Sequence, residues 1–310
     1  SRLVITTFIQ FFYTLFSNKN KMLRKFNKLQ NAIVILDEIQ SIPVKYWNII
    51  NEVFLKMAKK FNFYVILSTA TQPLIFDSTE EIIKNKEVYF KSFNRYCIHI
   101  DLKGKTIDEF ANGLELIEDR SYMFILNTIN SSKKLFNKLK ELYPCRQIEY
   151  LSTNIVPVER KKRIARIKSG LEKGEKLILV TTQLVEAGVD LDFDIVYRDF
   201  APFDSLVQSA GRCNRNGLKE AGTLHLIKLK DDNKGYFYQY IYDSVLCDIT
   251  EELIKNCTMI KESEIFELIN KYYELTRERK AQDVQFINAL KSLKFDGNKD
   301  EMTISKFELI

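Results

Sequence analysis

The stretch IVILDE, residues 33–38, joins a run of apolar residues to two adjacent carboxylates, Asp37 and Glu38. A second apolar run, YVIL at residues 64–67, leads in the same way into the hydroxyl-rich STAT at residues 68–71. Short apolar runs that end in polar residues predict buried strands of a parallel sheet. Because ligands of open α/β sheets lie at the carboxyl ends of strands, these polar residues stand where a ligand is expected.

Short β-rich runs of this kind recur along the chain and alternate with longer amphipathic stretches. In the stretches 46–61 and 131–142, apolar residues are spaced three and four apart, which is typical of helices that cover a sheet. Strands separated by helices imply parallel βαβ units, so the sequence predicts an α/β fold. The predicted strands are 3–7, 32–36, 63–67, 122–126, 147–151, 176–180, 194–197 and 223–227.

The run from Asn85 to Lys105 lacks a strong helical period and separates two blocks of the βα pattern. We therefore expect one domain over residues 1–94 and a second over residues 95–230. The pattern then becomes helical, and we expect residues 231–310 to form a helical C-terminal extension. The candidate helices of this extension are 237–254, 264–275 and 281–293.

The composition is that of a folded globular protein, since 45% of the 310 residues are hydrophobic and 28% are charged. The net charge of +6 permits a polyanionic partner without demanding one. The five cysteines are scattered, with no C-x-x-C pair, which indicates a reducing compartment and a cytoplasmic protein without a zinc knuckle or a disulfide framework. No apolar run approaches the ~20 residues of a membrane span, so no membrane partner is expected.

Asp37 and Glu38 are candidates for nucleotide chemistry. Asp37 is suited to hold Mg²⁺, usually through water, and Glu38 to polarise the water that attacks the γ-phosphate of ATP. The hydroxyl groups of Ser68, Thr69 and Thr71 are placed to hydrogen-bond these acids and to relay the state of the nucleotide. Taken alone, the first pattern also fits an exposed acidic strand end, and the second also fits a helix cap or a turn.

The segment LVTTQLVEAGVD, residues 179–190, leads from a buried strand into hydroxyl groups, an amide and a glycine-acid pair. Thr181, Thr182 and nearby backbone N–H groups suit the phosphates of a nucleic-acid backbone. Gly188 allows close approach of the main chain and Asp190 is suited to reach a ribose hydroxyl, so we expect both to contact the nucleotide. The alternative is a turn followed by a helix cap.

The segment QSAGRCNRNG, residues 208–217, carries Arg212 and Arg215 three positions apart. On a helical turn this spacing places both guanidinium groups on one face, from which they can point at the same anion. An arginine that reaches the γ-phosphate across a cleft accelerates hydrolysis by orders of magnitude. Gln208 is also expected on the nucleotide side. The alternative is a surface pair of arginines that forms ordinary salt bridges.

These segments, taken in order, resemble the motifs of superfamily 2 helicases: 37–40 motif II, 68–71 motif III, 124–128 motif IV, 181–190 motif V and 208–215 motif VI. Within that superfamily, three longer phrases are similar to the CRISPR-associated helicase-nuclease of type I interference systems. They are VITTFIQFFYTLFSNKNKMLRKFNKLQNAIVILDEIQSIP, LSTATQP and TTQLVEAGVDLDFDIVYRDFAPFDSLVQSAGRCNRNG. The resemblance covers about residues 1–230.

The resemblance implies two RecA-like lobes, of which the first is incomplete here, and a motor that uses ATP and Mg²⁺ to translocate along single-stranded DNA. It also implies recruitment by an RNA-guided surveillance complex that has opened an R-loop during antiviral interference. By the same resemblance, Thr6 and Thr7 fall near an early motif that touches the DNA backbone.

The sequence departs from this family in three places. Such helicases have a phosphate loop, G-x-x-x-x-G-K-[ST], upstream of motif II, yet no glycine precedes Gly104. Gly104-Lys105-Thr106 follows motif II, and the position five residues before Gly104 is His99, so we expect a chance match. Ile39-Gln40 replaces the Val-His or Ala-His of many relatives, which leaves the contact of the fourth position open. The chain's two histidines are too few for the family's metal-dependent nuclease, so no nuclease activity is expected.

These departures, with a first residue that is Ser and not Met, favour the C-terminal part of a helicase whose first lobe has lost its beginning and which is inactive alone. Two alternatives fit the same residues. One is a superfamily 2 helicase outside CRISPR defence, and the other is a module that binds nucleic acid or a partner complex without hydrolysing ATP.

Overall fold

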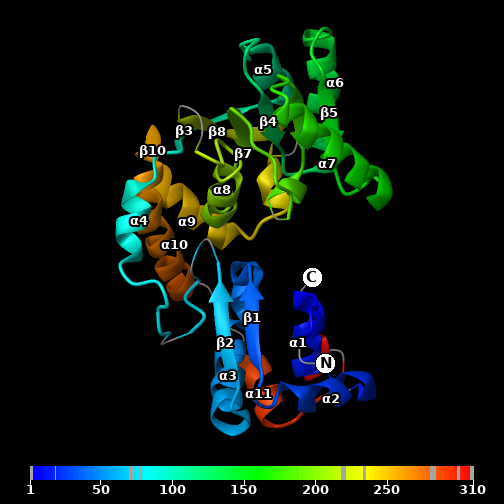
Figure 1. Cartoon of the computed structure of the whole chain (residues 1–310), viewed down its shortest axis with the longest axis vertical. Coiled ribbons are helices and arrows are strands. Elements are labelled where there is room, and N and C mark those ends of the chain that lie inside the picture. Colours follow the sequence, from blue (N-terminus) through cyan, green and yellow to red (C-terminus); the bar gives the residue numbers. More distant parts are fainter. Residues whose placement is uncertain are drawn as a thin grey trace. The chain divides into compact units, whose positions relative to one another are not determined.

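The computed structural model describes residues 3–17, 19–69, 71, 73–76, 79–186, 188–217, 221–232, 235–279, 284–298 and 301–307. The chain divides into two compact units. Unit 1 comprises residues 1–82 and 273–310, and unit 2 comprises residues 83–272. Each unit combines parallel strands with helices (Figure 1), which confirms the α/β class expected from the sequence.

The boundaries of the two units differ from the domain boundaries expected near residues 94 and 230. Residues 231–272 belong to unit 2, and residues 273–310 belong to unit 1. The stretch expected as a junction contains β3 (Tyr96–Lys105), which pairs in parallel with β8 (Gly222–Asp231). A strand that pairs with a strand so much later in the chain joins both ends of unit 2 into one sheet.

The sheet of unit 1 consists of β1 (Ile33–Asp37) and β2 (Tyr64–Ser68), which are parallel and in register from their first to their last residues. Residues 3–7, which were expected as a strand, lie outside any strand. Among the described residues, β1 and β2 pair with each other alone, and neither of them pairs with residues 3–7.

Aromatic side chains form much of the core of unit 1. Phe12 of α1 (Phe8–Phe16) stacks on Phe54 of α3 (Trp47–Phe61) at 6.1 Å between ring centroids, and Phe16 contacts Phe307 at 4.4 Å. The last residues of the described chain thus pack on its first helix. The other elements assigned to this unit are α2 (Asn20–Phe26), η1 (Asn27–Leu29), η2 (Ile39–Ser41), η3 (Val44–Tyr46), α11 (Val284–Lys291) and η7 (Ile304–Lys306).

One face of the β1–β2 sheet is exposed, although both strands were expected to be buried. Leu36 is buried, whereas Ile33 and Ile35 are 67% and 68% exposed. On β2, Tyr64 and Ile66 are 59% and 36% exposed, and they pair in register with Ile33 and Ile35. Parallel strands normally carry a layer on both faces, so this apolar face lacks its second layer in the part of unit 1 that the structure describes.

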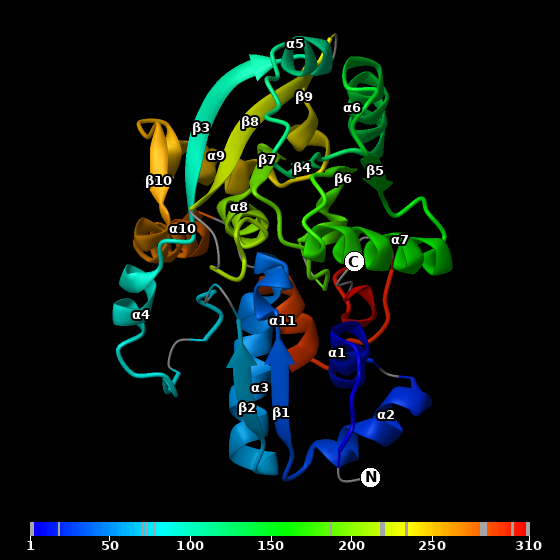
Figure 2. The ribbon, with the colours of Figure 1, turned by 45° about the horizontal axis from the view of Figure 1, so that its top comes forward.

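The sheet of unit 2 has the order β10-β3-β8-β7-β4-β6-β5, with β9 paired to β8. Figure 2 shows β3 and β8 as long neighbouring strands. Only β9 and β10 are antiparallel to their partners in this sheet, among the described residues. The remaining strands are β4 (Tyr122–Ile125), β5 (Ile148–Leu151), β6 (Ile178–Thr181), β7 (Ile195–Asp199), β9 (Gly235–Tyr236) and β10 (Met259–Lys261).

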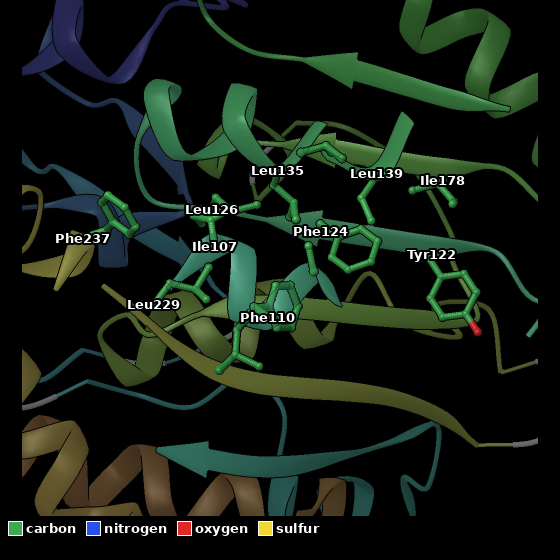
Figure 3. Close-up of a cluster of buried hydrophobic side chains, with 13 residues drawn as sticks. Ile107, Phe110, Tyr122, Phe124, Leu126, Leu135, Leu139, Ile178, Leu229 and Phe237 are labelled. Atoms are coloured by element: carbon green, nitrogen blue, oxygen red, sulfur yellow. The ribbon is translucent and has the colours of Figure 1, made fainter. Parts of the chain in front are cut away.

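Two helices cover one face of this sheet and close its main core. Phe110 of α5 (Ile107–Asn112) and Leu135 of α6 (Ile129–Leu142) pack against Phe124 of β4 (Figure 3). Thr106 and Thr128 cap α5 and α6, and each side chain accepts a hydrogen bond from a backbone N–H of the first turn. β4 therefore lies in the centre of the core, with β6 and β7 paired on its two sides.

On α8 (Phe203–Ala210), the helix that begins the motif VI region, the N-terminus is capped from a distant helix. Its N-cap position, Pro202, makes no side-chain cap, and the N–H of Phe203 instead donates to Thr250 Oγ1 at 2.9 Å. Thr250 lies on α9 (Ser244–Ile254), so a helix of the expected extension supports this motif. The other elements of the unit are α4 (Lys86–Ser92), α7 (Pro157–Glu172), η4 (Gln183–Val185), η5 (Phe237–Tyr240) and η6 (Glu262–Glu264), and α10 (Ile265–Arg279) contains the boundary between the units.

Candidate functional site

The candidate catalytic carboxylates lie at the end of β1, beside the hydroxyl groups at the end of β2. Ser68 Oγ donates a hydrogen bond to Asp37 Oδ1 at 2.9 Å, and the N–H of Glu38 donates to the Ser68 carbonyl at 3.0 Å. Glu38 has φ 55° and ψ 43°, a left-handed backbone conformation that residues with side chains rarely adopt. Such strain is concentrated at functional sites, and both carboxylates are exposed to solvent.

Gln40 connects Glu38 to the segment that follows β2. Its amide nitrogen donates to a carboxylate oxygen of Glu38, and its amide oxygen accepts a hydrogen bond from the Thr69 hydroxyl. The same hydroxyl accepts from the N–H of Thr71 at 3.2 Å. The structure thus supplies the contact of the fourth motif II position that the sequence left open. Ala70, between the two threonines, lies outside the described residues.

The contacts of Asp37 suit a magnesium ion that is held mostly by other ligands. Mg²⁺ in nucleotide sites takes one or two carboxylates and completes its octahedral shell with water and substrate phosphates. Asp37 is an exposed carboxylate at a strand end, which fits this pattern. In the described part of the chain, no group of three or more His, Cys, Asp and Glu side chains is arranged to hold a metal ion by itself.

Two further predictions concern threonines of unit 1. Thr71 Oγ1 lies 2.9 Å from the hydroxyl of Tyr273 on α10, so this threonine is fixed by a later helix. Thr7 is the N-cap of α1, where its side chain accepts from the N–H of Gln10 at 3.3 Å, and Thr6 is exposed. Capping is a sufficient structural reason for Thr7, and DNA contact by either residue stays a prediction.

In unit 2, the candidate residues gather where the strand order reverses. β4 lies between β6 and β7, so the chain crosses over β4 when it passes from one to the other. Such a reversal opens a crevice at the carboxyl ends of the strands, which is where open α/β sheets bind ligands. Thr181 and Thr182 follow β6 at this place, but both side chains are buried, and Thr181 Oγ1 donates to the Thr182 carbonyl at 3.2 Å. A phosphate could meet either hydroxyl only after these side chains become exposed.

The prediction that Arg212 and Arg215 share one helical face is wrong. α8 ends at Ala210, and Asn214, between the two arginines, has φ 48°, so the chain turns there instead of continuing as a helix. Arg212 is buried and donates from Nη2 to the Glu186 carbonyl at 2.7 Å. Arg215 is exposed and forms an ion pair with Asp190 at 3.2 Å. Both arginines therefore contact the segment after β6.

Asp190 is held between two cations. Its carboxylate lies 2.6 Å from Lys168 Nζ as well as beside Arg215, and the hydrogen bond from Lys168 lowers the pKa of Asp190. Gly188, two residues earlier, has φ 71°, a conformation that favours glycine. Gln208 is half-buried on α8. Asp37 and Glu38 belong to unit 1 and the arginines to unit 2, so their meeting around one nucleotide stays a prediction.

The sequence analysis missed a fully buried arginine, Arg198, at the end of β7. It is the largest of the fully buried side chains among the described residues, and it forms an ion pair with Glu186 at 2.8 Å. Its neighbour Asp199 is also fully buried, and burial raises the pKa of this carboxyl to about 7. The signal was present, because Arg198-Asp199 ends an apolar strand in the same way as Asp37-Glu38.

Gly104-Lys105-Thr106 has a structural reason at each position. Gly104 lies in β3, where an added Cβ would come within 2.8 Å of the Tyr236 ring. Lys105 pairs with Asp101 at 2.7 Å, and Thr106 caps α5. None of the described helices is both long and apolar enough to cross a membrane.

Comparison with known proteins agrees with the motif pattern. Residues 118–218 match the family described as CRISPR-associated nuclease/helicase Cas3, C-terminal. The chain is 25% identical to the CRISPR-associated nuclease/helicase Cas3 of Haloferax volcanii, in an alignment that covers 69% of the chain and 33% of that protein. A CRISPR-associated endonuclease/helicase Cas3 of Thermus thermophilus is 43% identical over 53 residues, which are 17% of the chain and 6% of that protein. The chain spans about a third or less of these relatives.

Solved structures agree on the fold. The structure of T. fusca Cas3 with ADP superposes with a TM-score of 0.70 over 93% of the chain and 40% of that protein, at 16% identity. A chain of a CRISPR RNA-guided surveillance complex in a pre-nicking state superposes with a TM-score of 0.65 over 90% of the chain and 42% of that chain, at 17% identity. In its motifs and its sequence, the chain is thus similar to the CRISPR-associated nuclease/helicases of the Cas3 type, and it shares their fold.

Proposed function

We propose that the chain is part of an ATP-driven motor that moves along single-stranded DNA during CRISPR antiviral interference. The observation that carries this proposal is the continuous contact from the strand-end carboxylates to the next strand. Asp37 is bound by Ser68, and Glu38 is joined through Gln40 to Thr69. A hydrogen-bonded link of this kind allows a change at the nucleotide to move the segment after β2.

In this proposal, the residues of unit 1 act on the nucleotide. Mg²⁺, when bound with ATP, neutralises charge on the phosphates. Asp37 would hold the ion through water, and the Ser68 hydroxyl would keep the carboxylate oriented. Glu38 would accept hydrogen bonds from the attacking water, and its hydrogen bond from Gln40 would aim it.

The residues of unit 2 would complete the nucleotide site and hold the DNA. Arg212 and Arg215 would approach the γ-phosphate, although from the turn after α8 and not from one helical face. For Arg215 to reach a phosphate, its ion pair with Asp190 must open, which would also release Asp190 for a ribose hydroxyl. We assign Gln208 and Gly188 to the nucleotide side, and Thr181 and Thr182 to the DNA backbone.

The chain cannot supply every part of such a motor. No glycine precedes Gly104, so no phosphate loop stands before motif II in this sequence. The exposed apolar face of the β1–β2 sheet supports the same view, because a parallel sheet needs a second layer. We propose that a further polypeptide segment completes the lobe, and that the chain by itself does not hydrolyse ATP.

Relatives point to the cofactor and to the partner. Structures of T. fusca Cas3 exist with ADP, with AMPPNP and with ATP, and another similar chain belongs to an RNA-guided surveillance complex. We therefore propose ATP and Mg²⁺ as cofactors, single-stranded DNA and such a complex as partners, and the cytoplasm as the location. The missing phosphate loop favours one other function, which is a module that binds nucleic acid without hydrolysis.

The first test is to sequence the gene upstream of the codon for Ser1 and to express what it encodes together with this chain. If the upstream sequence encodes a phosphate loop in frame, we expect ATP hydrolysis that single-stranded DNA stimulates. Glu38→Gln should lower kcat by about 100-fold or more, because the attacking water loses its base. Glu52→Gln, an exposed carboxylate in a surface ion pair on α3, is the matched control and should leave kcat unchanged.

Two results would overturn the proposal. Hydrolysis that persists in the Glu38→Gln variant would remove the catalytic assignment. A start codon directly before Ser1, without a phosphate loop in any co-expressed partner, would leave the nucleic-acid-binding module as the function of this product.

A further inference from the structure

All five N–H groups of the buried Arg198 find acceptors within unit 2. An arginine carries five N–H donors in a fixed planar fork, so five acceptors fix both its position and its orientation. The contacts are Nε to Ser209 Oγ at 3.2 Å, Nη1 to Asn127 Oδ1 at 2.7 Å and to the Asp199 carbonyl at 2.8 Å, and Nη2 to the Tyr242 hydroxyl at 2.7 Å and to Glu186 Oε1 at 2.8 Å. We call these side chains, Arg198 with Asn127, Glu186, Ser209 and Tyr242, the arginine cluster.

The arginine cluster joins segments that carry the candidate functional residues. Asn127 follows β4 in motif IV, Glu186 belongs to motif V, and Ser209 lies on α8 in motif VI. Ser209 Oγ also donates to Glu186 at 3.1 Å. The carbonyl of Glu186 accepts from Arg212, so the position of this motif VI arginine depends on how the cluster holds Glu186.

Net stabilisation is a weak explanation for such a cluster. Taking a carboxylate and a guanidinium out of water costs about as much as their attraction returns, and apolar replacements are often as stable. Burial raises the pKa of the Glu186 carboxyl, and Arg198 acts in the opposite direction. What a planar fork with five directed bonds does contribute is one defined arrangement of the groups that it contacts.

Tyr242 is the member of the cluster that lies outside the motifs. It follows η5, in the region for which the sequence suggested no role. Its hydroxyl accepts from Arg198 and also from Gln183 Nε2 at 3.2 Å, and Gln183 Nε2 donates to the Asn127 carbonyl at 3.0 Å as well. Gln183 directly follows Thr181 and Thr182. One tyrosine hydroxyl therefore connects the arginine to the loop that is assigned to the DNA backbone.

We propose that Tyr242 and Arg198 are positioning residues, which hold the loops after β4 and β6 and the turn after α8 in the arrangement that binds single-stranded DNA. The inference rests on the proposed function, which assigns the loop after β6 to the DNA backbone and the turn after α8 to the nucleotide. It deepens that function by giving residues beyond the motifs control over how the motifs bind.

The test uses the full chain and its Tyr242→Phe variant, which keeps the ring and loses the hydroxyl. Affinity for a labelled single-stranded oligonucleotide is measured by fluorescence anisotropy at several salt concentrations, and hydrogen exchange is followed by mass spectrometry. We expect faster exchange in residues 181–186 and 209–213. We also expect affinity about 3- to 10-fold weaker, the size of one lost hydrogen bond, with an unchanged salt slope because no charge is removed.

Tyr238→Phe is the matched control, because Tyr238 is a buried tyrosine of η5 that lies beside Lys228 and outside the cluster. A general loss of stability would affect both variants, whereas positioning affects only Tyr242→Phe. Ser209→Ala removes a different acceptor of Arg198 and provides an independent variant, with the same changes expected.

Normal exchange and normal affinity in Tyr242→Phe and in Ser209→Ala would overturn the inference. So would equal loss of affinity in Tyr238→Phe. If the wild-type chain binds no DNA, the proposed function fails by itself, and faster exchange of residues 181–186 and 209–213 then decides whether the cluster positions these loops.

Discussion

Two strands of this protein end in a pair of charged residues, and the two pairs meet opposite conditions. Asp37-Glu38 at the end of β1 is exposed to solvent. Arg198-Asp199 at the end of β7 is fully buried. β7 has β4 and β8 on its two sides, whereas β1 has β2 alone among the described strands. The neighbours of a strand, and not its own residues, decide whether charges at its end face water.

The difference also separates two kinds of function. An exposed pair is free to meet a ligand, and the left-handed backbone at Glu38 is a rare conformation of the kind that is concentrated at functional sites. A buried pair has its hydrogen bonds already made, so it can only hold other groups in place. The same sequence pattern therefore marks a candidate catalytic site in unit 1 and a positioning site in unit 2.

The largest effect is expected when Arg198, the buried arginine at the end of β7, is replaced. Arg198→Met leaves Glu186 buried without its cation, and we expect a loss of about 3–5 kcal/mol in the free energy of unfolding. Asp37→Asn, the equivalent change at the exposed strand end, should cost less than about 0.5 kcal/mol. Urea unfolding followed by far-UV circular dichroism measures both variants.

Trp47, the chain's single tryptophan, gives a control for this comparison because it lies in unit 1. Its fluorescence should report a smaller shift than circular dichroism in the Arg198→Met variant. Equal costs for Arg198→Met and Asp37→Asn would show that burial does not distinguish the two strand ends.

A smaller effect is expected at the cap of α8. Thr250→Ala removes the acceptor of the buried Phe203 N–H. We expect the free energy of unfolding of unit 2 to fall by about 1–2 kcal/mol. Thr250→Ser keeps the hydroxyl and should retain most of that stability. Thermal unfolding of the two variants side by side measures the difference. If Thr250→Ser is as unstable as Thr250→Ala, the methyl packing and not the cap explains the effect.

The smallest effect concerns a histidine inside the sheet of unit 2. His225 stacks between Tyr197 and His99 on neighbouring strands, at the edge of a cavity of about 300 Å³ that Asp101, Lys105 and Glu109 also line. Burial is the main cause that lowers the pKa of His225 to about 4, and the electrostatic effect of the neighbouring His99 acts in the same direction. The unfolded chain therefore takes up the proton first, and stability is lost as pH falls from about 6.5 towards 4.

His225→Phe keeps an aromatic ring and removes this titration. Between pH 7 and pH 5, the urea midpoint of the wild type should fall more than that of the variant. The same fall in both would assign the pH dependence to other groups.

The sequence predicted what depends on local pattern. The alternation of strands and helices, the strand-end acids and the helices at Trp47 and Ser131 could be read from the sequence pattern. β3 was missed because its residues mix charged, polar and apolar types, and its pairing with β8 is a long-range contact. α7 was missed because charged residues occupy most of its faces and leave little apolar period.

The types of residue in the candidate site could be predicted from the sequence, but the directions in which their side chains point could not. Arg212 and Arg215 were identified, yet the turn at Asn214 that separates them depends on contacts made by distant segments. Asn214 Nδ2 donates to the Arg95 carbonyl at 3.0 Å, across more than a hundred residues of sequence. Arg198 was passed over because a buried charge is recognisable only when its acceptors are known.

The open face of the β1–β2 sheet has a consequence for how the chain behaves in a test tube. No third strand pairs with β1 or β2 in the part of the chain that the structure describes, and an apolar strip with such open edges is a template onto which other chains can add strands. A second molecule offers the same strip, so purification at high concentration invites self-association through Ile33, Ile35 and Tyr64. Charged substitutions at these positions would keep the chain dispersed, and they would also hinder the further segment that we propose to complete the lobe.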